Sequence, residues 1–294
     1  MRFAWAFNPF DDNKKLQKKG LALLRAVSKS AERVEAVFVA SPRELALSTA
    51  FDVPEKTRFS KYPKTILQKA LKAMDLSQAT TSVLTQADVS LTSAAKKLAS
   101  YLDKIRADLT LVATYARQGR NIFTLGSFAE TLVHYAKTDL LVFSENSQIP
   151  KGTPKSLLFA HDLSSSGEKA LEHAIKYAKE WKASLHVLHI PDPVYDLKID
   201  DQDVQMVKYR QQVQAKLEKI KARLKRKGVK GSASLAIEWN PVSDLIVKGS
   251  KKVSADMVMV TAKAGRLAAL VGGSVTQQVL RTSNVPVIVI KCPA

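Results

Sequence analysis

The chain has 294 residues, 46% hydrophobic and 25% charged, which is the composition of a folded protein rather than a disordered one. No apolar run approaches the roughly 20 residues of a membrane-spanning helix, and the opening apolar stretch is too short for a signal peptide. The single cysteine, Cys292, excludes an intrachain disulfide and a multi-cysteine metal site. We therefore expect a cytoplasmic protein, and its length predicts two domains, each of about 100–200 residues.

Lys and Arg outnumber Asp and Glu by 46 to 27, a formal net charge of +19. Such an excess attracts polyanions, including nucleic acids, nucleotides, anionic lipids and acidic proteins. A solvated basic surface without a specific partner has the same composition, so charge by itself leaves both interpretations open.

The first half alternates apolar runs with amphipathic segments. The apolar runs predict buried strands and the amphipathic segments predict helices. The expected strands are 3–8, 33–40, 80–86, 107–114 and 138–144, and the expected helices are 11–27, 90–105 and 126–136.

The second half repeats this order. Ser-rich residues followed by Glu168 predict the start of a helix, Pro241 fits a first helical turn, and Gly228 marks a helix end. The expected strands are 156–162, 184–190, 232–239, 255–261 and 285–291, and the expected helices are 164–181, 201–227, 241–253 and 273–282.

An internal repeat relates the two halves. Residues 107–144 align without a gap with 255–292, so that Gly126 and Ser127 fall on Gly273 and Ser274. Strands that alternate with helices predict parallel sheets covered on both faces. The expected fold class is therefore α/β, with two tandem Rossmann-like domains at 1–147 and 153–294, each a five-stranded parallel sheet flanked by helices. The polar segment 145–154, with Gly and Pro, is the expected linker.

The chain resembles the universal stress protein family in its tandem form. The features that carry the resemblance are the strand–helix order, Asp162 at the end of a strand, and the segments 126–143 and 272–290. The resemblance covers nearly the whole chain and is clearest in the second half. It implies an adenine-nucleotide-hydrolase-like fold and a non-catalytic role in the stress response. Pairing between the last strands, 138–144 and 285–291, and a homodimer are also implied.

Many members of this family bind ATP: the first-strand Asp contacts the nucleoside, and a loop of pattern G-x-x-G-x9-G-[ST] wraps the phosphates. The resemblance implies that ATP or another adenine nucleotide binds the second half. The implied binding residues are Asp162, Thr261, Lys263, Gly265, Arg266, Gly273 and Ser274.

The glycine pattern is incomplete in both halves. The two earlier glycine positions hold Val260 and Lys263 in the second half, and Ala113 and Ala116 in the first. In the first half, Asn8 also replaces the strand-ending Asp, which predicts a degenerate site there. The alternative is that each Gly-Ser pair only caps its helix, which makes the chain a ligand-free scaffold.

The segment 207–231 combines an apolar stripe, Val213, Leu217, Ile220 and Leu224, with many basic residues. It predicts a helix packed on the sheet with a solvated basic face. A binding face for nucleic acid or another polyanion at 208–230 is the alternative, although stacking aromatics are scarce there.

Catalytic signatures such as a nucleophile elbow, a Walker loop or zinc-ligand spacing do not occur. His161, beside Asp162 at a strand end, is the histidine that could act in a site, because α/β folds place ligands there. A binding protein is favoured over an enzyme, with slow nucleotide hydrolysis as the remaining enzymatic alternative. We expect no catalytic residues and no metal.

Overall fold

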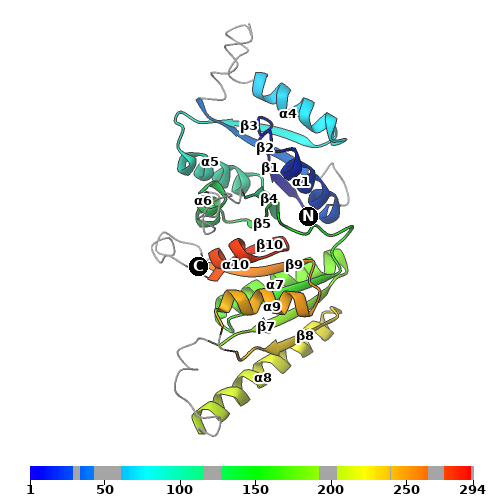
Figure 1. The fold of residues 1–294 in the computed structure, drawn as a ribbon, viewed down its shortest axis with the longest axis vertical. Helices are drawn as coiled ribbons and strands as arrows, with labels where there is room; N and C mark the ends of the chain where they lie inside the picture. Colours follow the sequence, from blue (N-terminus) through cyan, green and yellow to red (C-terminus); the bar gives the residue numbers. More distant parts are fainter. Residues whose placement is uncertain are drawn as a thin grey trace.

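The computed structural model describes residues 1–28, 34–42, 61–114, 127–191, 204–238, 240–263 and 275–292. Ten strands of this part form one sheet in the order β3-β2-β1-β4-β5-β10-β9-β6-β7-β8. Figure 1 shows the first half at one end of the elongated molecule and the second half at the other, with β5 and β10 in the middle.

Each half contributes five strands that run parallel to one another. In each half the strand order reverses beside the first strand, between β1 and β4 and between β6 and β9. This is the α/β, Rossmann-like fold expected from the sequence. The strands are β1 (Phe3–Ala6), β2 (Val34–Ala40), β3 (Thr80–Thr85), β4 (Leu109–Ala113), β5 (Asp139–Phe143), β6 (Ser156–Ala160), β7 (Ser184–His189), β8 (Gly231–Leu235), β9 (Met257–Lys263) and β10 (Val287–Cys292).

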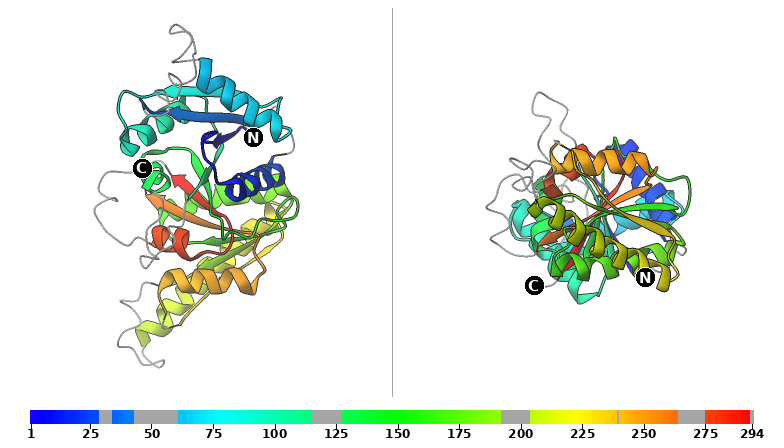
Figure 2. Two further views of the ribbon diagram at one scale, coloured as in Figure 1. Left: turned by 45° about the horizontal axis from the view of Figure 1, so that its top comes forward. Right: turned by 90° about the horizontal axis from the view of Figure 1, so that it is seen from below.

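Helices cover both faces of the sheet, as the two hydrophobic clusters show. Side chains of α1, α4, α7 and α8 pack in one cluster, and side chains of α5, α6, α9 and α10 pack in the other. Figure 2 shows the helices on both sides of the strands. The helices are α1 (Lys14–Val27), α4 (Lys61–Ala73), α5 (Leu91–Lys104), α6 (Ser127–Tyr135), α7 (Ser165–Trp181), α8 (Val204–Arg226), α9 (Val242–Lys252) and α10 (Val275–Thr282).

Side-chain caps explain where the well-predicted helices begin. The side chain of Asn13 accepts a hydrogen bond from the backbone of Leu16, so α1 begins at Lys14 rather than at residue 11. Ser164 caps α7 in the same way, because a side-chain oxygen satisfies a backbone N–H that has no partner inside the helix. The amphipathic helix α4 was not among the helices predicted from the sequence.

The two halves join through the predicted pair of last strands. Strands β5 and β10 pair antiparallel, with Val287 opposite Val142 and Val289 opposite Leu140. This confirms the expected pairing of 138–144 with 285–291 within one chain. Because each strand covers the other's edge, neither leaves unpaired backbone groups at the centre of the molecule.

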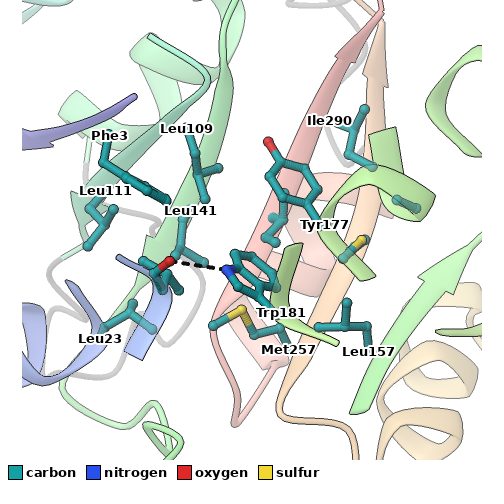
Figure 3. Packing of buried hydrophobic residues seen from close by; sticks show 14 of the residues in the cluster. Phe3, Leu23, Leu109, Leu111, Leu141, Leu157, Tyr177, Trp181, Met257 and Ile290 are labelled. Carbon is teal, nitrogen blue, oxygen red and sulfur yellow. Dashed lines mark hydrogen bonds between the residues drawn. The ribbon is translucent and has the colours of Figure 1, made fainter. Parts of the chain in front are cut away.

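The hydrophobic core continues across this junction. Figure 3 shows Phe3, Leu109 and Leu141 of the first half packed near Tyr177 and Trp181 of α7. The indole nitrogen of Trp181 donates a hydrogen bond of 3.1 Å to the carbonyl oxygen of Val27 at the end of α1. One sheet and one hydrophobic cluster therefore run through both halves, and the division into domains 1–147 and 153–294 stays a prediction.

A buried polar cluster, which we call the junction cluster, lies beneath the same contact. The carboxylate of Asp139 accepts hydrogen bonds from the backbone N–H of Lys291 (2.8 Å) and from the hydroxyl of Tyr177 (2.7 Å), and contacts Nδ1 of His173 at 2.8 Å. Asp139 and Lys291 are only 4% and 2% exposed. The junction cluster connects β5, α7 and β10, so it joins polar groups of both halves.

Candidate functional site

The predicted nucleotide site falls where the strand order of the second half reverses. Strands β6 and β9 are parallel neighbours there, with Leu157 opposite Met257 and Phe159 opposite Met259. Asp162 is the second residue after β6, and Thr261 lies in the last part of β9. Ligands of open α/β sheets bind in the crevice at the carboxyl ends of two such strands. The structure therefore brings Asp162 and Thr261 to the same edge of the sheet.

Asp162 folds back onto the start of α7. Its Oδ1 accepts hydrogen bonds from the backbone N–H of Ser164 (3.0 Å) and from the Ser164 hydroxyl (2.7 Å). A Cβ atom on Gly167 would lie only 2.3 Å from this oxygen, so glycine is the residue that allows the close approach. One carboxylate oxygen thus stabilises the helix start, where a negative charge is favourable.

The beginning of α10 lies against the end of β9. The Thr276 hydroxyl, in the first turn of α10, donates a hydrogen bond of 3.1 Å to the carbonyl oxygen of Thr261. The first backbone N–H groups of a helix have no partner inside it, and together with the helix dipole they attract anions. This contact places a helix N-terminus of that kind at the same edge of the sheet as Asp162.

The remaining predicted site residues cannot be placed in this geometry. Lys263 is the last residue of β9, but its side chain is not among the described parts. Gly265, Arg266, Gly273 and Ser274 lie outside the described residues. Their part in a nucleotide site stays a prediction.

His161 is a buried structural residue in this arrangement. It is 2% exposed, its Nδ1 accepts a hydrogen bond from the backbone of Leu163 (2.7 Å), and its Nε2 lies 3.6 Å from a carboxylate oxygen of Glu168. The carbonyl oxygen of His161 in turn accepts a hydrogen bond of 2.8 Å from Nδ1 of His189. Burial lowers the pKa of both histidines, so both rings are neutral near pH 7.

A cavity of about 580 Å³ lies in the first half, at the carboxyl ends of β1, β2 and β4. Its wall includes Trp5, Phe7, Phe38 and Phe143. The incomplete glycine pattern had predicted a degenerate site in this half, and nothing in that pattern indicated a cavity. The one signal available in the sequence was the concentration of aromatic residues in 3–10.

The long basic helix α8 packs on the sheet through its apolar stripe. Its stripe residues Val213, Leu217, Ile220 and Leu224 are buried in the core, as expected. Arg223 forms ion pairs of 2.6 Å with both Glu168 and Glu172 of α7. Part of the positive charge of 208–230 is thus neutralised within the fold, and polyanion binding by this segment stays a prediction.

Among the residues that the structure describes, no group of three or more His, Cys, Asp or Glu side chains is arranged to hold a metal ion. None of the helices in that part of the chain has the length and apolar character to cross a bilayer.

Comparison with known proteins gives matches of two kinds. The model of the Universal stress protein family matches residues 154–291. A universal stress protein of Methanocaldococcus jannaschii is 27% identical over 142 residues, which cover 47% of this chain and 83% of the relative.

Solved structures match over the whole length. A universal stress protein from Archaeoglobus fulgidus has a TM-score of 0.67 at 16% identity, covering 98% of this chain and 96% of that one. A putative universal stress protein from Pseudomonas aeruginosa has a TM-score of 0.61 at 15% identity, covering 99% and 93%. At these identities the structural likeness establishes a common fold, while the sequence match lies in the second half. Residues 154–291 therefore match the universal stress protein family in sequence, and the whole chain shares the fold of the solved universal stress protein structures.

Proposed function

We propose that the chain is a non-catalytic universal-stress-type protein of the cytoplasmic stress response, and that its second half binds ATP or another adenine nucleotide. The observation that supports this most is that Asp162 and the first turn of α10, which is hydrogen-bonded to Thr261, lie at the carboxyl ends of the neighbouring strands β6 and β9. This edge also lies within the half that matches the family model.

In the proposed complex, the polar groups divide between the sugar and the phosphates. Asp162 keeps one oxygen on Ser164 and offers the other to a ribose hydroxyl. Phosphates lie near the start of α10, where the helix dipole and the backbone N–H groups that have no partner inside the helix favour negative charge. Lys263 and Arg266 supply neutralising charge, and Gly273 and Ser274 allow the backbone to approach the phosphates closely.

Calorimetric titration of the nucleotide-stripped full chain with ATP and with AMP tests this proposal. We expect saturable heat, and an affinity that falls about tenfold in Asp162→Ala because a charge-assisted hydrogen bond contributes roughly 1.5–3 kcal/mol. Asn8→Ala changes the equivalent position of the first half and should leave the affinity unchanged. Ser164→Ala removes the cap of α7 and keeps the Asp162 carboxylate. This variant therefore shows whether a loss of nucleotide affinity comes from a weakened helix start or from the missing carboxylate.

Two results would count against the proposal. Absence of heat with either nucleotide at millimolar concentration, with no nucleotide co-purifying, would contradict binding. Phosphate release that disappears in Asp162→Ala would instead identify the chain as a slow nucleotide hydrolase.

A further inference from the structure

The first-half cavity has the size and position of a ligand pocket. Its volume is about 580 Å³, within the range of roughly 300–1,000 Å³ that small-molecule sites occupy. It opens where the strand order reverses between β1 and β4, which is the general ligand position in open α/β sheets. Leu16 of α1, Leu98 of α5 and Ala129 of α6 all contribute to the wall, so the cavity extends to both faces of the sheet.

Close packing holds the aromatic part of the wall in place. The rings of Trp5 and Phe7 lie 4.5 Å apart. A Cβ atom on Gly20 of α1 would come within 2.9 Å of both Trp5 and Phe143, so α1 presses directly against these two rings. Aromatic side chains fixed in this way offer flat apolar surfaces to a ligand without losing much conformational entropy.

The described part of the wall offers no positive charge to a phosphate group. Among the described residues that line the cavity, Asp11 is the one with a formal charge, and Lys, Arg and His do not occur. This contrasts with a net charge of +19 for the chain. An anion that leaves water for this cavity would lose its hydration and gain no opposite charge. The described part of the wall therefore fits an uncharged molecule.

Gln86 gives the wall a polar group that a ligand can use. It follows β3 and lines the cavity, and its side-chain Oε1 is buried without a hydrogen-bond partner in the structure. A turn of the amide toward the cavity breaks no hydrogen bond at this oxygen. A ligand with an N–H or O–H group would therefore satisfy an acceptor that the fold leaves unpaired.

We propose that the first half binds an uncharged, largely aromatic small molecule that carries a hydrogen-bond donor, in the cavity bounded by Trp5, Phe38 and Phe143. This site is separate from the proposed nucleotide site. The chain then has two ligand sites of different chemistry at equivalent positions of its two halves, an apolar site in the first and an anion site in the second.

The fluorescent probe N-phenyl-1-naphthylamine tests the proposal, because it is uncharged, aromatic and carries one N–H donor. Titration of the full chain with this probe should show saturable binding, with energy transfer from Trp5. Ala6→Leu narrows the cavity and should weaken binding about tenfold, since added methyl groups in a packed wall cost roughly 1–3 kcal/mol. Ala160→Leu makes the same change at the matching position of β6 and should leave binding unchanged.

A second variant removes the polar contact without filling the cavity. Gln86→Leu replaces a buried acceptor that has no partner, so the fold should remain stable. It should weaken binding of the N–H probe and leave binding of its N-methyl analogue unchanged. The proposal is overturned if the folded chain gives no saturable signal, if Ala6→Leu and Ala160→Leu weaken binding equally, if Gln86→Leu affects both probes alike, or if ATP displaces the probe.

Discussion

Replacement of Asp139 by Ala should destabilise the fold by about 2–5 kcal/mol, because it removes the buried acceptor of two buried hydrogen-bond donors. Asp139 accepts hydrogen bonds from the backbone of Lys291 and from the hydroxyl of Tyr177, and it contacts the ring of His173. The variant leaves two buried donors without this acceptor, and each such loss costs about 1–3 kcal/mol. The Tyr177 hydroxyl keeps a 3.3 Å hydrogen bond to the carbonyl oxygen of Asp108. The expected loss of stability is therefore smaller than the two largest hydrogen-bond costs added together.

Urea unfolding followed by tryptophan fluorescence measures this cost. Trp181 stacks on Tyr177 with ring centroids 5.2 Å apart, so its emission reports on the junction cluster directly. Asp103→Ala is the matched control, because Asp103 pairs with Lys137 at 2.9 Å but both side chains are more than half exposed. Exposed pairs contribute at most about 1 kcal/mol.

A cost for Asp139→Ala no larger than that of Asp103→Ala would show that the hydrogen bonds of Asp139 do not stabilise the junction. A double-mutant cycle with Tyr177→Phe gives a second check, since groups that share a hydrogen bond should show a coupling energy of about 0.5–3 kcal/mol. Full additivity of the two changes would mean that the hydrogen bond between them contributes nothing to stability.

Three further predictions concern the same fold. Gly167→Ala should lower the melting temperature, because the added Cβ would lie 2.3 Å from Oδ1 of Asp162. Gly152→Ala is the control, since its Cβ would have nothing within 4 Å and should leave the melting temperature almost unchanged. Equal melting temperatures of the two variants would contradict this. The contact with Asp139 raises the pKa of His173, so its contribution to stability is complete below the unfolded value of about 6.5 and is lost as pH rises through the raised folded pKa. The stability difference between the chain and His173→Gln, measured in urea from about pH 5 to 8, should therefore shrink with pH, and a difference that grows would oppose this. Val289→Lys places a charge in the fully buried contact between β5 and β10. It should destabilise the chain by more than about 3 kcal/mol in the same urea assay. A cost below about 1 kcal/mol would mean that this strand pair does not join the two halves.

Most of the fold could be predicted from the sequence because its signals are local. Alternation of apolar runs with amphipathic segments predicted the strands of both halves, and Gly228 ends α8 with a positive φ of 72°, as expected for a helix stop. The repeat of 107–144 in 255–292 predicted equivalent last strands, and the structure pairs them. These features depend on neighbouring residues or on repetition, which one sequence displays directly.

The junction cluster and the cavity could not be predicted because they depend on distant residues. Asp139 meets Lys291 across 152 positions and Tyr177 across 38, and no local pattern marks such a pair. The cavity combines side chains of β1, β2, β4, α1, α5 and α6, so its volume follows from packing alone. The family resemblance predicted a site in the second half, and it gave no sign that the Asp162 carboxylate is hydrogen-bonded to Ser164 at the start of α7.

Titration of the nucleotide-stripped full chain with ATP tests the central claim, nucleotide binding by the second half, most directly. We predict saturable binding of ATP. Asp162→Ala should weaken it, whereas Asn8→Ala and a saturating amount of N-phenyl-1-naphthylamine should leave it unchanged. No binding at millimolar ATP, or equal loss in Asp162→Ala and Asn8→Ala, would contradict it.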